Sequence, residues 1–190
     1  RNNISIINNS LKKILKEIDK KKDIFHSLSK SFKLNLNTEE LKKFRKFNQM
    51  VVVGMGGSIL GTKAIYSFLH HKIKKKIIFL DNLDQRQIEN FSKNKLSKNN
   101  LFIVVSKSGN TIETITNLNL IKKNKLNSSN TIVIIEKKQN ALNKFAKKEN
   151  ILTIEHKNFI GGRYSVLSEV GMVPAYLMGL SISKIRKNFL

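Results

Sequence analysis

The stretch LFIVVSKSGNTIET, residues 101–114, joins a continuous apolar run to a polar loop and the start of a helical pattern. Five apolar residues in a row, followed at once by serine, glycine and asparagine, are typical of a strand buried on both faces. Apolar residues then recur at helical spacing over residues 112–121. A buried strand that leads through a polar loop into a helix is the repeating unit of a parallel sheet.

The same alternation of strand and helix runs through most of the chain. We expect strands over residues 50–53, 76–80, 101–105, 131–135 and 151–154. We expect helices over residues 59–68, 85–91, 112–121, 141–146 and 165–180, with Pro174 kinking or shortening the last of them. The pattern predicts an α/β fold with a flavodoxin-like, doubly wound, five-stranded parallel sheet and helices on both faces. Such sheets bind ligands at the carboxyl ends of their strands.

Two helices are expected before the sheet. Apolar residues recur at helical spacing over residues 4–18, with lysines on the other face. A short helix is predicted over residues 38–47, with Thr38 as its N-cap and glutamates in its first turn. We therefore expect an N-terminal helical segment, residues 1–48, that packs on an α/β domain formed by residues 49–190.

The composition limits the classes of protein that the chain resembles. It has no cysteine, which excludes disulfides and thiolate metal sites. No apolar run approaches the roughly 20 residues of a membrane span. The formal net charge of +23 invites a nucleic-acid-binding interpretation. However, the lysines are spread over the whole chain beside abundant Asn and Ile, as A/T-rich codons would specify, so we predict no nucleic-acid partner and only an attraction for anionic substrates.

The first candidate loop is GMGGS, residues 54–58, directly after the first strand of the sheet. Glycines there let the backbone approach a ligand, and the next helix points free N–H groups at an anion. The candidate residues are Gly56, Gly57 and Ser58. The loop lacks the Gly-Lys-Ser/Thr ending of a phosphate-binding P-loop, and the third glycine of a dinucleotide fingerprint is Ile59 instead. A tight turn without a ligand remains the alternative.

The second candidate loop is SKSGNTIET, residues 106–114. It gathers three hydroxyls and one ammonium at a helix start: Ser106, Ser108, Thr111 and Lys107. Hydroxyls and helix N-terminal N–H groups are what a phosphate monoester needs. The alternative is helix capping, because Asn110 and Glu113 have the spacing of a capping box.

The third candidate loop is GGRYSVLSEVG, residues 161–171, which places Arg163 after the last strand. A surface ion pair is one interpretation of this arginine, and such a pair contributes little to stability. The second interpretation is that Arg163 stabilises negative charge that develops in a transition state. The position of the guanidinium beside two glycines, at the ligand-binding edge of the sheet, favours this second interpretation.

Taken together, in this order and spacing, the three loops resemble those of the glucose-6-phosphate isomerase family over about residues 50–180. The first two are similar to the sugar isomerase (SIS) domain in general, and the third narrows the resemblance to the isomerase. The resemblance implies that the substrate phosphate is held by Ser106, Lys107, Ser108 and Thr111. It also implies that Gly56, Gly57 and Ser58 line the site where the sugar binds, and that Arg163 stabilises the enediolate.

The reaction implied is the interconversion of glucose 6-phosphate and fructose 6-phosphate, in glycolysis and gluconeogenesis, by proton transfer between C2 and C1. The resemblance also implies a cytoplasmic homodimer that needs no metal and no organic cofactor. At Gly109 the sequence departs from one branch of the family, in which a bulky aromatic residue is common. A bifunctional phosphoglucose/phosphomannose isomerase and a phosphosugar-binding SIS module of a regulator therefore stay open as alternatives.

The family's catalytic glutamate lies well beyond the arginine motif. We therefore expect a second SIS domain beyond residue 190, and we expect the 190-residue chain alone to be inactive. The resemblance gives Glu169 no role as a base. His156, at the end of a predicted strand, is interpreted as structural.

Overall fold

The computed structural model describes residues 2–18, 20–84, 86, 89, 99–121 and 126–187. Its centre is a five-stranded sheet in the order β2-β1-β3-β4-β5, with every neighbouring pair parallel. The strands are β1 (Gln49–Gly54), β2 (Lys76–Leu80), β3 (Asn100–Ser106), β4 (Thr131–Ile135) and β5 (Leu152–Glu155). This confirms the predicted strands and the doubly wound, flavodoxin-like class, in which the strand order reverses between β1 and β3.

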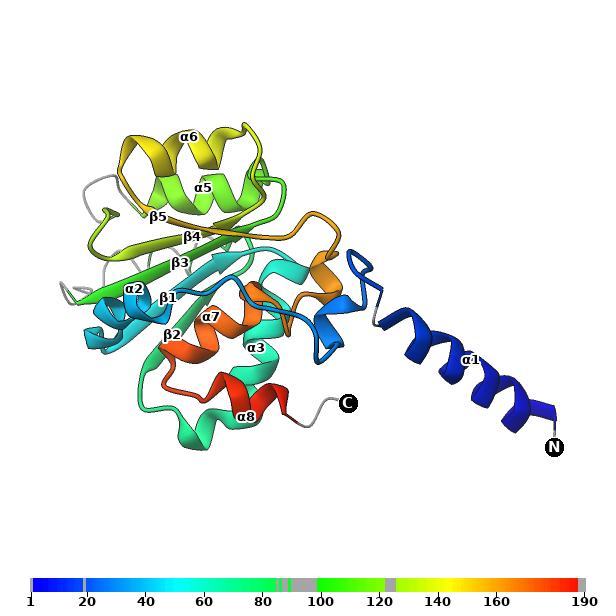
Figure 1. The fold of residues 1–190 in the computed structure, drawn as a ribbon. Helices are drawn as coiled ribbons and strands as arrows, with labels where there is room; N and C mark the ends of the chain where they lie inside the picture. The colour runs from blue at the N-terminus through cyan, green and yellow to red at the C-terminus, as the bar shows by residue number, and fades with distance from the viewer. Residues whose placement is uncertain are drawn as a thin grey trace.

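Helices cover both faces of the sheet (Figure 1). One face carries α5 (Ile112–Leu120) and α6 (Ala141–Lys148), and the other carries α3 (Gly57–Leu69) and α7 (Glu169–Leu177). The helix α8 (Ile182–Arg186) lies beyond α3 and α7, farther from the sheet. Alternate strand residues supply the two cores: Met50 and Val52 pack with the α7 side, whereas Val51 and Val53 pack with the α5 and α6 side. Most of the helix predicted over residues 85–91 lies outside the described residues.

The strand β3 lies at the middle of the sheet, and all seven of its residues are buried. It has apolar residues on both sides because helices cover both faces of the sheet. Its end is level with the ends of its neighbours, since Gly54 pairs with Val105 and Ser106 pairs with Ile135. The register therefore places the loops that follow β1, β3 and β4 at one edge.

The last helix is shorter than predicted. Ser168 caps α7, and a separate 3-10 turn, η5 (Gly162–Tyr164), precedes it. Pro174 lies inside α7 without ending it at once. Proline has no N–H to donate to the carbonyl four residues back, which is that of Val170. The hydroxyl of Thr62, on α3, donates to that carbonyl at 3.4 Å, so the oxygen keeps a partner.

The N-terminal region has two parts. The helix α1 (Asn2–Ile18) is confirmed, and it extends away from the body of the molecule (Figure 1). The predicted 38–47 helix is instead α2 (Thr38–Lys42) followed by the 3-10 turn η2 (Lys43–Lys46). Its N-cap is Asn37 and not Thr38, because the Asn37 side chain accepts hydrogen bonds from the first-turn N–H groups. Two more 3-10 turns are η1 (His26–Leu28) and η3 (His70–Lys72).

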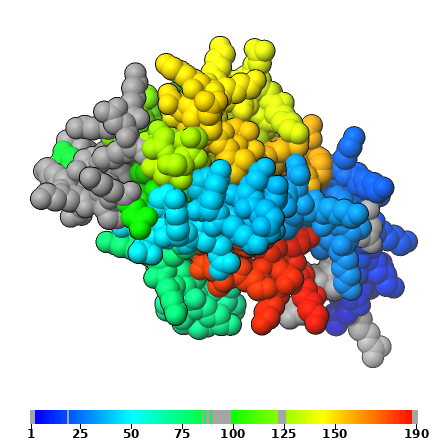
Figure 2. Space-filling view, turned by 60° about the vertical axis from the view of Figure 1, so that its left-hand side comes forward, coloured from blue at the N-terminus to red at the C-terminus, as the bar shows by residue number. Residues whose placement is uncertain are grey.

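Residues before β1 contribute to the core. Leu41, Phe44 and Phe47 are buried in the cluster that lies under α7. Figure 2 shows this segment, in cyan, lying between the yellow α6 region and the red C-terminal helices. The division of the chain at residue 48 stays a prediction. Within the described residues, no helix is long and apolar enough to cross a membrane.

Phe44 provides a test of this packing. Phe44→Ala should lower the free energy of unfolding by about 3–5 kcal/mol, because it leaves a cavity at a residue that is 0% exposed. The control is Phe68→Ala, at a residue that is 82% exposed, where the free energy of unfolding should change by no more than about 0.5 kcal/mol. Urea unfolding measures both, and equal effects would contradict the packing described for the N-terminal segment.

Candidate active site

The glycine turn and the arginine loop touch backbone to backbone. Gly57 starts α3, and a Cβ on it would lie 2.4 Å from the carbonyl carbon of Gly162 and 2.7 Å from the N of Arg163. No side chain fits between them. Gly56, just before, has φ +53°, a conformation that favours glycine. Ser58 follows in the first turn of α3, half-buried. The structure thus brings the first and third predicted loops together.

The three predicted hydroxyls converge where α5 begins. The Thr111 Oγ1 lies 3.1 Å from the Ser106 Oγ and 3.2 Å from the Ser108 Oγ. The N–H of Gly109 donates to the Ser106 Oγ at 3.1 Å, which curls the loop around this oxygen. Thr111 is the N-cap residue of α5, and its side chain makes no capping hydrogen bond. The N-terminal end of α5 therefore keeps its anion-attracting character beside three hydroxyls.

The capping-box alternative is wrong for Asn110. Its side-chain oxygen accepts a hydrogen bond from the N–H of Ala141, at the start of α6, at 3.1 Å. The next N–H, that of Leu142, donates to the Gly109 carbonyl at 3.1 Å. The loop thus caps α6 and not α5, and α6 in turn supports the loop from behind.

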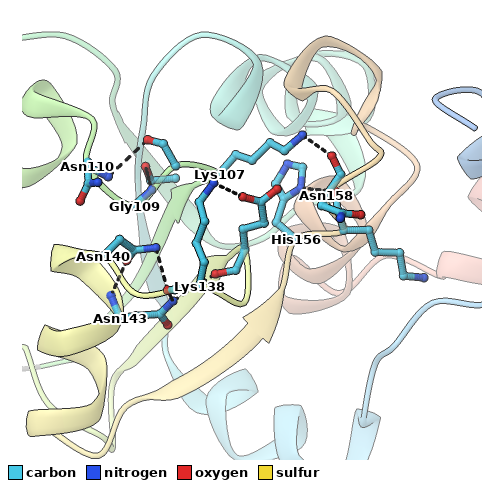
Figure 3. Close-up of polar contacts among 12 residues, drawn as sticks. Lys107, Gly109, Asn110, Lys138, Asn140, Asn143, His156 and Asn158 are labelled. Carbon is cyan, nitrogen blue, oxygen red and sulfur yellow. Dashed lines mark hydrogen bonds and ion pairs between the residues drawn. The ribbon is translucent and has the colours of Figure 1, made fainter. Parts of the chain in front are cut away.

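Gly109 is fixed by its neighbour Asn140. Its φ is +69°, and a Cβ there would lie 2.3 Å from the Asn140 side chain. Asn140 is itself held in place, because it caps α6 by accepting the N–H of Asn143 at 2.8 Å. Figure 3 shows Asn140 beside Gly109. A bulky aromatic residue could not replace Gly109 with Asn140 in this position, which gives a physical reason for the departure noted in the sequence.

The ammonium of Lys107 lies on the loop that leads to Arg163. It donates to the carbonyl of Asn158 at 2.6 Å (Figure 3). It also donates to the carbonyl of Ile160 at 3.1 Å. The structure therefore directs this side chain away from the hydroxyls. Its predicted contact with a phosphate stays a prediction.

Arg163 is exposed in η5 and has no hydrogen-bond or ion-pair partner in the described part of the chain. Because no carboxylate among the described residues pairs with Arg163, the structure does not support the interpretation of this arginine as half of a surface ion pair. Its loop is well held, because the Ser165 hydroxyl donates to the Gly162 carbonyl at 2.6 Å. The guanidinium is thus free on an anchored backbone.

His156 and Glu169 both face the interior. His156 is 1% exposed, and its Nδ1–H donates to the Lys157 carbonyl at 3.1 Å. Burial lowers the pKa of His156; the hydrogen bond to Lys157 opposes this shift, and the charge of Lys107 adds to it. Glu169 is 0% exposed, and its Oε1 accepts the Asn35 N–H at 2.8 Å and lies 3.4 Å from the Lys157 ammonium.

Two supporting residues were missed by the sequence analysis. The role of Asn140, which fits over Gly109, could have been predicted in part, since asparagine directly before an amphipathic helix is a common N-cap. The role of Thr62, whose hydroxyl donates to the Val170 carbonyl in place of the missing N–H of Pro174, could not have been predicted. Thr62 and Val170 meet only in the folded protein.

Each loop stands at the carboxyl end of a parallel strand, and two of them flank the point where the strand order reverses. A doubly wound sheet that presents a glycine turn and a hydroxyl loop there defines an SIS-type domain. The profile of the family described as phosphoglucose isomerase matches residues 2–185. The chain belongs to the phosphoglucose isomerase family.

Individual relatives agree with this assignment. Glucose-6-phosphate isomerase of Methanocaldococcus jannaschii is 36% identical over 151 residues, covering 78% of this chain and 37% of that protein. The probable glucose-6-phosphate isomerase of Methanococcus maripaludis is 34% identical over 190 residues, covering 94% and 43%. A solved glucose-6-phosphate isomerase from Chlamydia trachomatis superposes with a TM-score of 0.65 at 29% identity, covering 78% of this chain and 29% of that one. The chain thus spans about two-fifths of these curated relatives.

The buried His156 predicts a pH dependence of stability. Its pKa is lowered in the folded protein, so below its ordinary value of about 6.5 the unfolded chain binds the proton more readily. Stability should therefore be fully present above that pH and fall as the pH drops, by up to about 1.4 kcal/mol per pH unit. His156→Gln should remove this part of the slope, whereas His71→Gln, at an exposed histidine, should not. Identical slopes for wild type and His156→Gln in urea unfolding from pH 7.5 to 5 would contradict the assignment.

Proposed function

We propose that the protein contributes the phosphosugar-binding part of an isomerase that interconverts glucose 6-phosphate and fructose 6-phosphate in glycolysis and gluconeogenesis. The observation that carries the proposal is the occurrence of two features at one sheet edge. One is a hydroxyl cluster on the N-terminal end of α5, and the other is an arginine that has no partner among the described residues, on a loop packed against the glycine turn. Membership of the phosphoglucose isomerase family supports the same reaction.

The phosphate binds at the start of α5. The Thr111 hydroxyl lies 3.1 Å from that of Ser106 and 3.2 Å from that of Ser108, so the three can reach one group of phosphate oxygens. Hydrogen bonds to an ionised acceptor are stronger than those between neutral groups, and the positive end of the helix adds to them. The sugar then extends from this end of the sheet toward Gly56, Gly57 and Ser58.

Arg163 stabilises the enediolate. A cation that lacks a partner in the ground state contributes most when negative charge appears in the transition state. Arg163 is such a cation within the described residues, and the contact of Gly162 with Gly57 fixes the backbone beside it. The proposal thus gives the phosphate and the reacting carbons separate binding groups.

We assign the proton transfer to a group outside this chain. A general base must come within hydrogen-bond reach of the C2 proton. Glu169 does not offer this, because it is fully buried and bound by Asn35 and Lys157. His156 is buried as well. The 190-residue chain alone therefore binds phosphosugars without isomerising them. A cytoplasmic location, a homodimer and the absence of a cofactor stay predictions.

The hydroxyl cluster predicts a loss of phosphosugar affinity on mutation. Thr111→Val and Ser106→Ala should each weaken binding of 6-phosphogluconate about tenfold or more, because each removes a hydrogen bond to a charged group worth about 1.5–3 kcal/mol. Thr153→Val, at an exposed threonine on β5, is the control and should leave affinity unchanged. Calorimetry gives the affinities. Loss of stability with intact affinity would show that the cluster only shapes the loop.

Arg163 predicts a loss of turnover. In the complete protein, Arg163→Ala should lower kcat about 100-fold or more with little change in KM, since its charge meets a partner only in the transition state. The assay couples conversion of fructose 6-phosphate to detection of glucose 6-phosphate. The 190-residue chain, tested in parallel, should bind 6-phosphogluconate and show no turnover.

Two results would count against this assignment. An Arg163→Ala protein with normal kcat and a raised KM would make Arg163 a binding residue. A complete protein that binds phosphosugars yet isomerises neither glucose nor mannose 6-phosphate would point to a regulatory binding module instead.

A further inference from the structure

We infer that Lys107 is a positioning residue, whose ammonium ties the phosphate-binding loop to the loop that carries Arg163. This inference rests on the proposed function for its effect on catalysis. It departs from the role that the sequence suggested for this side chain, which was direct contact with the substrate phosphate.

The segment between β5 and η5 is anchored at both ends. At its start, the N–H of His156 donates to the carbonyl of Ile135 at 2.8 Å and so extends the pairing of β5 with β4. At its end, Ile160 is 0% exposed, and its N–H donates to the Lys157 carbonyl at 3.1 Å, which closes a turn. Between these anchors, the carbonyls of Asn158 and Ile160 converge on the ammonium of Lys107, at 2.6 and 3.1 Å.

These two hydrogen bonds hold the backbone of residues 158–160 in place, and we call this contact the Lys107 brace. A lysine ammonium has three donors, and two of them are used here by main-chain oxygens. Charge-assisted hydrogen bonds of this kind are stronger than neutral ones. Among the described residues, Lys107 forms no ion pair with a carboxylate that would compete for the same donors.

Arg163 depends on such a brace because two glycines precede it. Gly161 and Gly162 give the backbone more freedom than other residues would, so contacts from elsewhere must fix its course. Two such contacts are the packing of Gly162 on Gly57 and the bond from Ser165 to the Gly162 carbonyl. Lys107 supplies a third, at the other end of the glycine pair.

The brace starts from the phosphate loop itself. Lys107 lies between Ser106 and Ser108, whose hydroxyls form the proposed phosphate site. A phosphate that orders these neighbours would also steady the lysine backbone, and through its side chain the loop that holds Arg163. One side chain thus couples substrate binding to the position of the group that stabilises the enediolate.

The first test measures the loop directly and needs no activity. In the 190-residue chain, Lys107→Met should speed amide hydrogen exchange about tenfold or more at Ile160, Tyr164 and Ser165, whose N–H groups bond within the loop. Lys107→Arg should retain part of the protection. Lys138→Met is the matched control, because this lysine follows β4 at the same edge and pairs with Glu136 instead. Unchanged exchange in Lys107→Met would overturn the inference.

The second test separates positioning from phosphate binding. In the complete protein, Lys107→Met should lower kcat about tenfold or more while the inhibition constant of inorganic phosphate changes less than about twofold. Combined with Arg163→Ala, it should cause little further loss, because both act through the same guanidinium. A large loss of phosphate affinity with normal exchange would make Lys107 a phosphate ligand and overturn the inference. If Arg163→Ala and Thr111→Val leave the complete protein unimpaired, the proposed function fails, and the exchange experiment still decides whether Lys107 braces the loop.

Discussion

The site depends on one contact in which two backbones meet without side chains. Gly57 and Gly162 come from the first and last of the three loops, and a Cβ on Gly57 would lie 2.4 Å from its partner. Any other residue would force the start of α3 away from η5. This contact sets the distance between the glycine turn and Arg163, so the placement of the only guanidinium in the three loops follows from the absence of a side chain at Gly57.

A second glycine plays the same part at the hydroxyl loop. Gly109 admits the Asn140 side chain, and the loop in return accepts the first N–H groups of α6. The parallel register makes the two arrangements neighbours, because β1, β3 and β4 end level with one another. The first two N–H groups of α6 are thus bound by the hydroxyl loop, while the start of α5 is left without a side-chain cap and can attract an anion.

The fold was predictable from sequence because strand burial appears directly in composition: a sheet covered on both faces gives continuous apolar runs such as residues 101–105. The grouping of the three hydroxyls was predictable too, since they are neighbours in the chain. Predictions failed where a local pattern competed with a distant partner. Asn110 has capping-box spacing but bonds to α6. The bond from Thr62 to the Val170 carbonyl, one turn before Pro174, had no signal in the sequence. The target of Lys107 could not be predicted, because a long flexible side chain reaches carbonyls about 50 residues away.

The contacts of Lys107 also bear on the proposed recognition of one anion by a chain with a net charge of +23. The field of dispersed surface lysines draws anions of every kind, and at physiological salt it fades within about 8–10 Å. Selection among phosphosugars must therefore come from short-range groups of fixed geometry. Hydroxyls and helix N–H groups have that property, whereas a mobile ammonium does not. Bound to two carbonyls, Lys107 still contributes its charge to the local potential, while its donors fix the loop that carries Arg163. In the proposed site, the neutral groups select the phosphate and the cation organises the backbone around it.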